Sequence, residues 1–528
     1  MRGLTRRGFV GLAAMAPFSA SRLLAESAPG LAGGTHDLTL LYTNDFHSAF
    51  DPIPGYWLPG SPRLGGAAHL ATAIEHARSR ARTSFLLDSG DMFTGTMSLL
   101  THGEALMEMM TAMRYDGMGV GNHEFDYGWE SFEQQIARVA FPVVCANVRY
   151  RLAAPEARPV RFCRPFSILE RNGVRVGIVG VMGARASRYT IMPSKITGIE
   201  FLDPVAETTA AVRAIRDAVD VVVVLGHQGL PGAMQTDAEN DPDVQRPLDE
   251  DIDFCREVEG IDVYVAAHSH HGLEEPIVVP RTGTILVQTY GYGTRLGLLE
   301  LSIKDRKVVG HRGHLEKIWS DELPAEPAVA ARLAYYRNKV APEIGPEIAK
   351  ATSRLTRKYN RESALGSFVA DVLRERLHCD AAVTNAGGLR ADLPAGSLNR
   401  GHVLDALPFL NAAVALELSG ADLRGVLEQG CSLTAGMCQV SGITARYDLR
   451  QPVGSRVVDL RVDGRKVESE KRYRVVTNSF LAEGGDRYES FKNGREIGRD
   501  ALLSECVVDF LRGAGTVAPP VPGRLQPV

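Results

Sequence analysis

Five short segments in the first half of this 528-residue chain are rich in side chains that bind metal ions. Each follows an apolar run typical of a buried strand, such as LTLLYT before the first segment and VDVVVVLG before the fourth. Ligands of α/β proteins gather where strands end and loops begin, so we expect one shared site. Carboxylate, amide and imidazole donors in this number predict two divalent cations, and they suit Mn, Zn, Co or Fe. The candidate ligands are Asp45, His47, Asp91, Asn122, His227, His268 and His270.

Local spacing indicates how some of these ligands are arranged. Asp45 and His47 are two residues apart, which places both side chains on one face of an extended segment. Asp91 follows Ser89 and Gly90, small residues that let the chain bend and expose a carboxylate able to bridge two ions. We therefore predict Asp91 as the shared ligand.

A catalytic pair is predicted beside the ligand Asn122. His123 would hydrogen-bond a phosphoryl group or assist the leaving oxygen, and Asp126, three residues on, would fix the orientation of that imidazole. Two cations about 3.5–4 Å apart polarise phosphoryl oxygens and lower the pKa of a bound water. The chemistry expected here is hydrolysis by water attack on phosphorus.

These segments resemble the calcineurin-like metallophosphoesterases, whose motifs run D-x-H, G-D, G-N-H-D/E, H and G-H-x-H. The narrower variant TNDFHS, SGDMFTG, GNHEFDYG, LGHQG and AAHSHH is similar to the 5′-nucleotidase family of exported nucleotide hydrolases. Ala267 departs from the glycine usual before the first histidine. The resemblance implies one ion held by Asp45, His47, Asp91 and His270, and a second held by Asp91, Asn122, His227 and His268.

The resemblance extends to the second half of the chain and implies a nucleoside pocket there. NAGGLR, LPFLN and NSFLAEGGD are similar to three C-terminal motifs of the family. In relatives the arginine and asparagine hold phosphate, two phenylalanines clamp the base, and the aspartate binds the ribose. The residues implied are Asn385, Arg390, Phe409, Asn411, Phe480 and Asp486.

The chain also departs from the family near the start of this second domain. Relatives commonly have a further phosphate-binding arginine at the position that falls near Tyr359. Arg357 and Arg361 are the two candidates to replace it.

The order of elements predicts an α/β protein. Apolar strands alternate with helical stretches from about residue 37 to 320, which predicts helices on both faces of the sheets. With the resemblance, the fold class is a four-layer α/β/β/α metallophosphoesterase sandwich followed by a smaller α/β domain. The expected segments are a signal peptide over 1–25, a catalytic domain over 37–320, a linker with one helix over 321–355 and a substrate-binding domain over 356–528.

Composition and the N-terminus restrict partners and location. Arg6-Arg7 before a short apolar stretch predicts a twin-arginine export signal, with an ordinary secretory signal as the alternative. We therefore expect an exported, periplasmic protein that uses the twin-arginine machinery and has no transmembrane segment. A net charge of −4 offers no field for polymeric nucleic acid. Seven cysteines exclude a complete disulfide framework; Cys431 and Cys438 are expected to be free and buried, with a disulfide between them across a loop as the alternative.

The predicted function is release of phosphate from nucleoside 5′-monophosphates, with UDP-sugars as further substrates. The first alternative is a 2′,3′-cyclic-nucleotide phosphodiesterase with 3′-nucleotidase activity. Less favoured are a thiosulfonate-ester hydrolase, whose substrate has no base to stack, and a non-catalytic nucleotide-binding protein, which would be expected to lose ligands.

Overall fold

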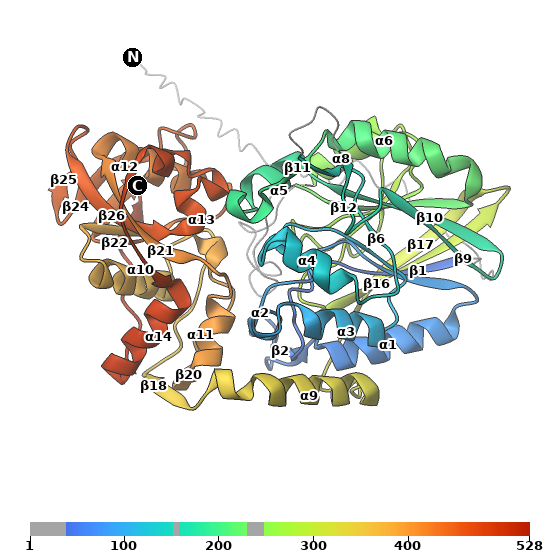
Figure 1. Ribbon diagram of the computed structural model, residues 1–528, viewed down its shortest axis with the longest axis horizontal. Coiled ribbons are helices and arrows are strands. Elements are labelled where there is room, and N and C mark those ends of the chain that lie inside the picture. The colour runs from blue at the N-terminus through green and yellow to red at the C-terminus, as the bar shows by residue number, and fades with distance from the viewer. Residues whose placement is uncertain (1–37, 152–157, 230–247) are drawn as a thin grey trace, which may run out of the picture.

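The computed structural model describes residues 38–151, 158–229 and 248–528 (Figure 1). The predicted export signal lies outside these residues. The chain forms two lobes, with the elements from β1 to β17 in one and those from β18 onward in the other (Figure 1). Helix α9, Pro327–Ile344, runs along the lower edge between them.

The first lobe contains two six-stranded sheets. In one sheet the central strands run parallel, and the last two strands of the lobe add antiparallel at one edge. Its order is β17 (Lys307–Lys317), β16 (Arg295–Lys304), β1 (Leu38–Thr43), β4 (Ser84–Asp88), β5 (Gly117–Gly119) and β6 (Val143–Val144).

The second sheet has a parallel centre and an antiparallel strand at each edge. Its order is β14 (Ile277–Val278), β15 (Ile285–Val287), β13 (Val263–Val265), β12 (Val221–His227), β10 (Val174–Met182) and β9 (Phe166–Arg171). Every residue of β12 is buried, as expected of a strand covered on both faces.

Hydrophobic packing joins these sheets into four layers. Side chains such as Leu40, Phe85 and Val223 fill the space between the two sheets. Helices α1 (Ala67–Arg80) and α3 (Glu104–Ala112) cover the outer face of the first sheet, and α6 (Pro204–Ile215) and α8 (Asp249–Glu257) cover that of the second. The predicted α/β/β/α sandwich is confirmed.

The helical stretch SLLTHGEALMEMMTAMR is divided in the structure. Helix α2 (Thr96–Leu100) ends before α3 begins. Gly103 between them has φ +84°, and a Cβ there would lie 1.8 Å from the ring of Phe93. Because only glycine fits that close approach, Gly103 explains the break between α2 and α3.

The second lobe is built around a five-stranded sheet. Helices α10 (Ala364–Arg376) and α14 (Leu503–Ala514) pack on one face and α12 (Gly420–Ser432) on the other. The sheet order is β22 (Gln439–Ser441), β19 (Ala381–Thr384), β26 (Arg472–Asn478), β21 (Ala412–Ser419) and β27 (Arg495–Leu502).

Two smaller sheets complete this lobe. The order of the first is β25 (Arg465–Lys466), β24 (Val457–Val462), β23 (Ile443–Tyr447) and β29 (Leu525–Pro527), and that of the second is β20 (Gly396–Asn399), β18 (Glu347–Ala351) and β28 (Thr516–Val517). The segment predicted as linker therefore ends in β18, which pairs within the second lobe. The helix predicted in that segment is α9, which packs on α1 and α3 of the first lobe.

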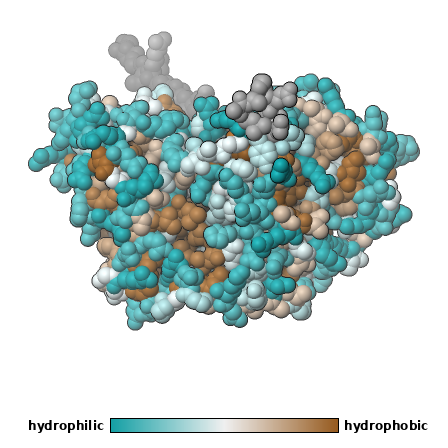
Figure 2. Space-filling model, viewed as in Figure 1, coloured by the Kyte–Doolittle hydropathy of each residue, from teal (hydrophilic) through white to brown (hydrophobic). Residues whose placement is uncertain are grey.

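The hydrophilic surface and the buried cysteines are those expected of a globular protein. The face in Figure 2 is largely hydrophilic, with hydrophobic residues in smaller patches. All seven cysteines are free and buried, as expected for Cys431 and Cys438. Within the described part of the chain, no helix combines the length and the apolar character needed to cross a bilayer.

Candidate active site

The predicted metal ligands lie just beyond the carboxyl ends of parallel strands from both sheets. Asp45 and His47 follow β1, Asp91 follows β4, and Asn122 follows β5. From the second sheet, His227 is the last residue of β12, and His268 and His270 follow β13. The sandwich thus brings five distant segments to one edge, and all seven side chains are buried.

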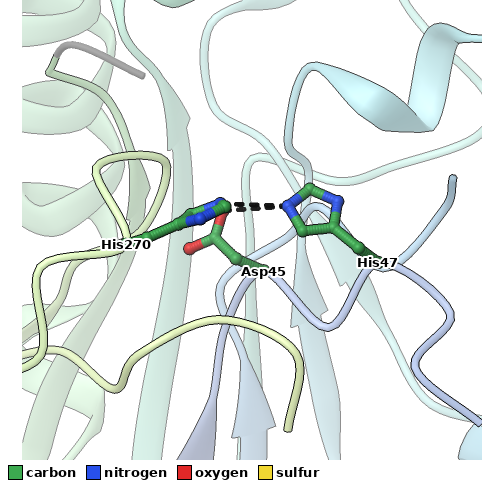
Figure 3. A group of neighbouring side chains, drawn as sticks. All are labelled: Asp45, His47 and His270. Atoms are coloured by element: carbon green, nitrogen blue, oxygen red, sulfur yellow. Dashed lines mark hydrogen bonds and ion pairs between the residues drawn. The ribbon is translucent and has the colours of Figure 1, made fainter. Parts of the chain in front are cut away.

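The first group of donors is formed by Asp45, His47 and His270 (Figure 3). The Nε2 atoms of the two imidazoles are 3.0 Å apart, and His270 Nε2 is 3.4 Å from Asp45 Oδ1. Two donors that each lie about 2.1 Å from one ion at a right angle are about 3 Å apart, so this spacing fits a cation.

The second group of donors is formed by Asp91, Asn122, His227 and His268. His227 Nε2 lies 3.1 Å from both Asp91 Oδ2 and Asn122 Oδ1. His268 Nε2 is buried and has no hydrogen-bond partner among the described residues. A buried nitrogen without a partner is costly, and a metal ion would satisfy it. Both groups therefore fit divalent cations.

Electrostatics around these donors also favours cation binding. Burial lowers the pKa of His268 to about 3, which keeps its imidazole neutral and able to bind a metal. Burial opposes ionisation of Asp91, but the charges of His227 and His123 outweigh it and hold the pKa well below the usual range. His227 gains most from the charge of Asp91, which, against burial, raises its pKa to about 10. A cation at this group would displace that proton.

Glu124 organises the backbone around the second group, although it was not among the predicted site residues. Its carboxylate accepts four backbone hydrogen bonds of 2.6–3.3 Å, from Gly121, Asp91, Met92 and Phe93. These amides belong to the loops that carry Asp91 and Asn122. The signal was present in the sequence, because an acidic residue follows Asn-His within the motif.

The predicted pair His123 and Asp126 lies at the boundary between the two lobes. His123 Nδ1 is 3.1 Å from both carboxylate oxygens of Asp126, and Thr94 Oγ1 donates to Asp126 Oδ2 at 2.9 Å. His123 Nε2 is 3.9 Å from Asp91 Oδ2, so the imidazole borders the metal ligands. Burial lowers the pKa of His123, but the carboxylates of Asp126 and Asp91 outweigh it and raise that pKa.

Two residues of the second lobe contact His123 directly. Arg390 Nη2 lies 2.7 Å from His123 Nε2, and the ring of Phe409 stacks on the imidazole at 5.5 Å. The guanidinium also lies over the Phe409 ring at 5.4 Å. The lobes therefore meet at the predicted catalytic residue.

One pocket contains all six predicted nucleoside- and phosphate-binding residues, together with part of the metal site. Asn385 Nδ2 donates to Asp486 Oδ2 at 2.8 Å, and Asn385 Oδ1 accepts from Asn478 Nδ2 at 3.1 Å. The second-lobe lining includes Asn385, Arg390, Phe409, Asn411, Phe480 and Asp486, and the first-lobe lining includes Asp91, Asn122, His123, His268 and His270.

A further part of the lining of this pocket was not predicted. It comes from Thr190, Ile191, Met192 and Lys195 of the first lobe. Ser194, within the 3₁₀ turn Pro193–Ile196, binds Glu483 of the second lobe through its N–H and its hydroxyl, both at 3.1 Å. No motif marks this segment, since its position depends on how the lobes meet.

The structure separates the two candidates for the missing phosphate arginine. Arg357 is buried and its charge acts on Tyr292 beside the metal ligands, whereas Arg361 is exposed. Tyr359 occupies part of the pocket wall. Arg357 as the replacement therefore stays a prediction.

The chain matches known families over most of its length. Residues 38–272 match the calcineurin-like phosphoesterase family, and residues 344–493 match the C-terminal domain of 5′-nucleotidases. Fold and site together define a metal-dependent phosphoric ester hydrolase with an added C-terminal domain.

Whole-chain comparisons narrow that class. The structure is similar to that of a 5′-nucleotidase precursor from Thermus thermophilus, with a TM-score of 0.81, 30% identity, and coverage of 93% of this chain and 99% of that one. The snake venom 5′-nucleotidase of Naja atra is 28% identical over 93% of this chain and 99% of its own length. The trifunctional nucleotide phosphoesterase YfkN of Bacillus subtilis is 28% identical over 94% of this chain, which spans only 35% of that longer protein. The chain belongs to the 5′-nucleotidase family.

Proposed function

We propose that this protein is an exported hydrolase that releases phosphate from nucleoside 5′-monophosphates and also cleaves UDP-sugars. The observation that carries the proposal is the shared pocket. Its lining combines metal ligands with Phe409, Phe480 and Asp486, the residues expected to bind the base and the ribose. A nucleotide has the phosphate, sugar and base that such a lining would recognise.

Several side chains have defined tasks in this proposal. Arg390 supplies a forked donor for the phosphate, and His123 hydrogen-bonds the phosphoryl group or assists the departing 5′-oxygen. Asp126 keeps the imidazole oriented through the contacts to Nδ1. Asn385 helps Arg390 to hold the phosphate, and Asp486, which accepts a hydrogen bond of 2.8 Å from Asn385 Nδ2, binds the ribose.

The metal ligands complete the reaction centre. Two divalent cations, when bound, supply positive charge that stabilises the phosphoryl group and lowers the pKa of a bound water. Asp91 takes part in both proposed ligand sets, and its carboxylate lies within 4.8 Å of donor atoms of His47 in the first set and of His227 and His268 in the second, which is compatible with that role.

Phosphate release by the purified mature protein tests the proposal. We would compare the metal-free protein with protein loaded with Mn²⁺ or Zn²⁺ on AMP, 3′-AMP, 2′,3′-cyclic AMP, UDP-glucose and a plain phosphomonoester. We expect metal-dependent activity with AMP preferred. Equal turnover of the plain ester would contradict the nucleoside pocket, and preference for the cyclic or 3′-substrate would favour the phosphodiesterase alternative.

Export requires a separate experiment, because residues 1–25 lie outside the described structure. We expect the wild-type precursor to reach the periplasm. Replacing both Arg6 and Arg7 with lysine should retain it in the cytoplasm. Export of this variant at the wild-type level would indicate an ordinary secretory signal.

A further inference from the structure

Tyr292 lies beside the first group of metal ligands, in the loop between β15 and β16. Its backbone N–H donates to the carbonyl of Asp45 at 2.8 Å. Its ring centroid is 5.2 Å from that of His47 and 5.9 Å from that of His270. The backbone has φ +65°, a conformation that bulky residues rarely adopt and that is often maintained at functional sites.

The hydroxyl of Tyr292 is a buried donor without a partner. The residue is only 6% exposed, and the hydroxyl oxygen makes no hydrogen bond to any part of the chain that the structure describes. Leaving such a group unsatisfied costs about 1–3 kcal/mol. The donor is therefore available for a ligand.

Tyr292 also lines a second cleft. It has a volume of about 550 Å³ and is lined by both lobes, with His47, Thr94, Tyr292, Arg390 and His402 among its residues. Arg390 also lines the nucleoside pocket, so the two cavities meet beside the metal ligands.

The charges around the hydroxyl suit an anion with several acceptor oxygens. The guanidinium groups of Arg390 and Arg357 act on the Tyr292 side chain, as do the carboxylates of Asp45 and Asp91, whose negative charge bound cations would offset. A phenol is protonated at neutral pH and can donate, and arginine donates as a fork to phosphate oxygens. Cations at the ligand groups would add further positive charge.

We propose that the Tyr292 hydroxyl donates a hydrogen bond to a non-bridging oxygen of the phosphoryl group at the metal centre, and to inorganic phosphate after hydrolysis. This proposal rests on phosphoester hydrolysis at the site, but it does not depend on a nucleoside. Tyr292 then contacts the substrate together with Arg390 and contributes to binding of both substrate and product.

The test is Tyr292→Phe in the full mature protein loaded with Mn²⁺, because phenylalanine keeps the ring and removes only the hydroxyl. Three quantities are measured: the dissociation constant of inorganic phosphate by calorimetry, kcat and KM on a plain phosphomonoester, and Tm without phosphate. We expect phosphate binding and kcat/KM to weaken by about tenfold or more, as for hydrogen bonds to charged groups. Metal content and Tm should not fall.

A matched control separates this role from packing. Tyr336, a buried tyrosine on α9 in the core of the first lobe, is replaced by phenylalanine in the same way. Tyr336→Phe should leave phosphate binding unchanged. Wild-type phosphate affinity and kcat/KM in Tyr292→Phe would overturn the proposal and indicate that only water binds the hydroxyl.

The probes keep this proposal distinct from the proposed nucleotide specificity. Inorganic phosphate and the plain ester have no base. A loss of phosphate binding in Tyr292→Phe therefore supports the proposal even if AMP is not the preferred substrate.

Discussion

The guanidinium of Arg390 donates a hydrogen bond of 2.7 Å to His123 Nε2 across the boundary between the lobes. Because Nε2 accepts this bond, the neutral imidazole has its proton on Nδ1, which faces Asp126. Both residues are proposed to contact the phosphate, so a bound phosphoryl group would replace their direct contact. The Arg390 guanidinium and the His123 imidazole thus already point to the same place, where the phosphoryl group is proposed to bind.

Replacing His123 with asparagine should abolish most activity without loss of metal. We expect kcat/KM for AMP to fall by about 10²- to 10⁴-fold, the usual contribution of a general acid or base. The measurements are steady-state kinetics and metal content per chain. His271→Asn is the matched control, since that imidazole is outside the predicted ligand set. Near-normal activity in His123→Asn would rule out the proposed role.

Replacing Asp126 with asparagine should move the pH dependence of the reaction. Asp126 raises the pKa of His123, so its loss lowers that pKa. The limb of the kcat/KM profile that reports His123 should therefore shift to lower pH. We also expect a fall of about 10- to 100-fold in the maximum, typical of carboxylates that orient an active-site imidazole. An unchanged limb would assign it to another group.

Glu124→Gln should weaken metal binding and stability together. The amide of glutamine cannot accept at its nitrogen, which leaves backbone donors near Asp91 or Gly121 unsatisfied. We expect the unfolding free energy to fall by about 2 kcal/mol or more and metal affinity to fall about 10- to 100-fold. Denaturant titration and metal competition measure the two effects.

Glu130→Gln is the control for this variant, because Glu130 is an exposed acidic residue of α4, Trp129–Ile136. It should change neither quantity. If Glu124→Gln matched this control, the four backbone bonds would have no organising role.

Phe480→Ala should affect nucleotides selectively. Loss of one stacking ring should raise KM for AMP by about 5- to 150-fold, equivalent to about 1–3 kcal/mol. A plain phosphomonoester has no base, so its kinetics should change little. Equal losses on both substrates would indicate a general disturbance of the pocket, which Tm would reveal.

Phe409→Ala should behave differently, since this ring also stacks on His123 and lies beneath Arg390. We expect kcat to fall as well as KM to rise, and the effect should extend to the plain ester. The contrast between the two phenylalanine variants tests whether Phe409 connects base binding to the reaction centre.

The metal ligands could be predicted from the sequence because each lies at the end of a strand that is itself recognisable. His227 ends an all-buried strand, and Asp91 follows another, so the same short segment predicts both the strand and the ligand. Lys195 could not be predicted, because it lines the pocket only through the meeting of two lobes. Likewise β18 carries no local sign of its partner β28, which lies near the end of the chain and pairs through Lys350 and Thr516.

The backbone of the metal site has a consequence for protein engineering. Asp45, His47, Asp91, His268 and His270 all have φ between +46° and +69°, where side chains with a Cβ are strained. Glycine adopts this region freely. Substituting glycine at His268, whose buried Nε2 has no hydrogen-bond partner among the described residues, should therefore yield a protein that is inactive yet more heat-resistant in the metal-free state. Selection for thermal stability alone would then favour variants that have lost a metal ligand. Screens for more stable variants should therefore also measure enzymatic activity.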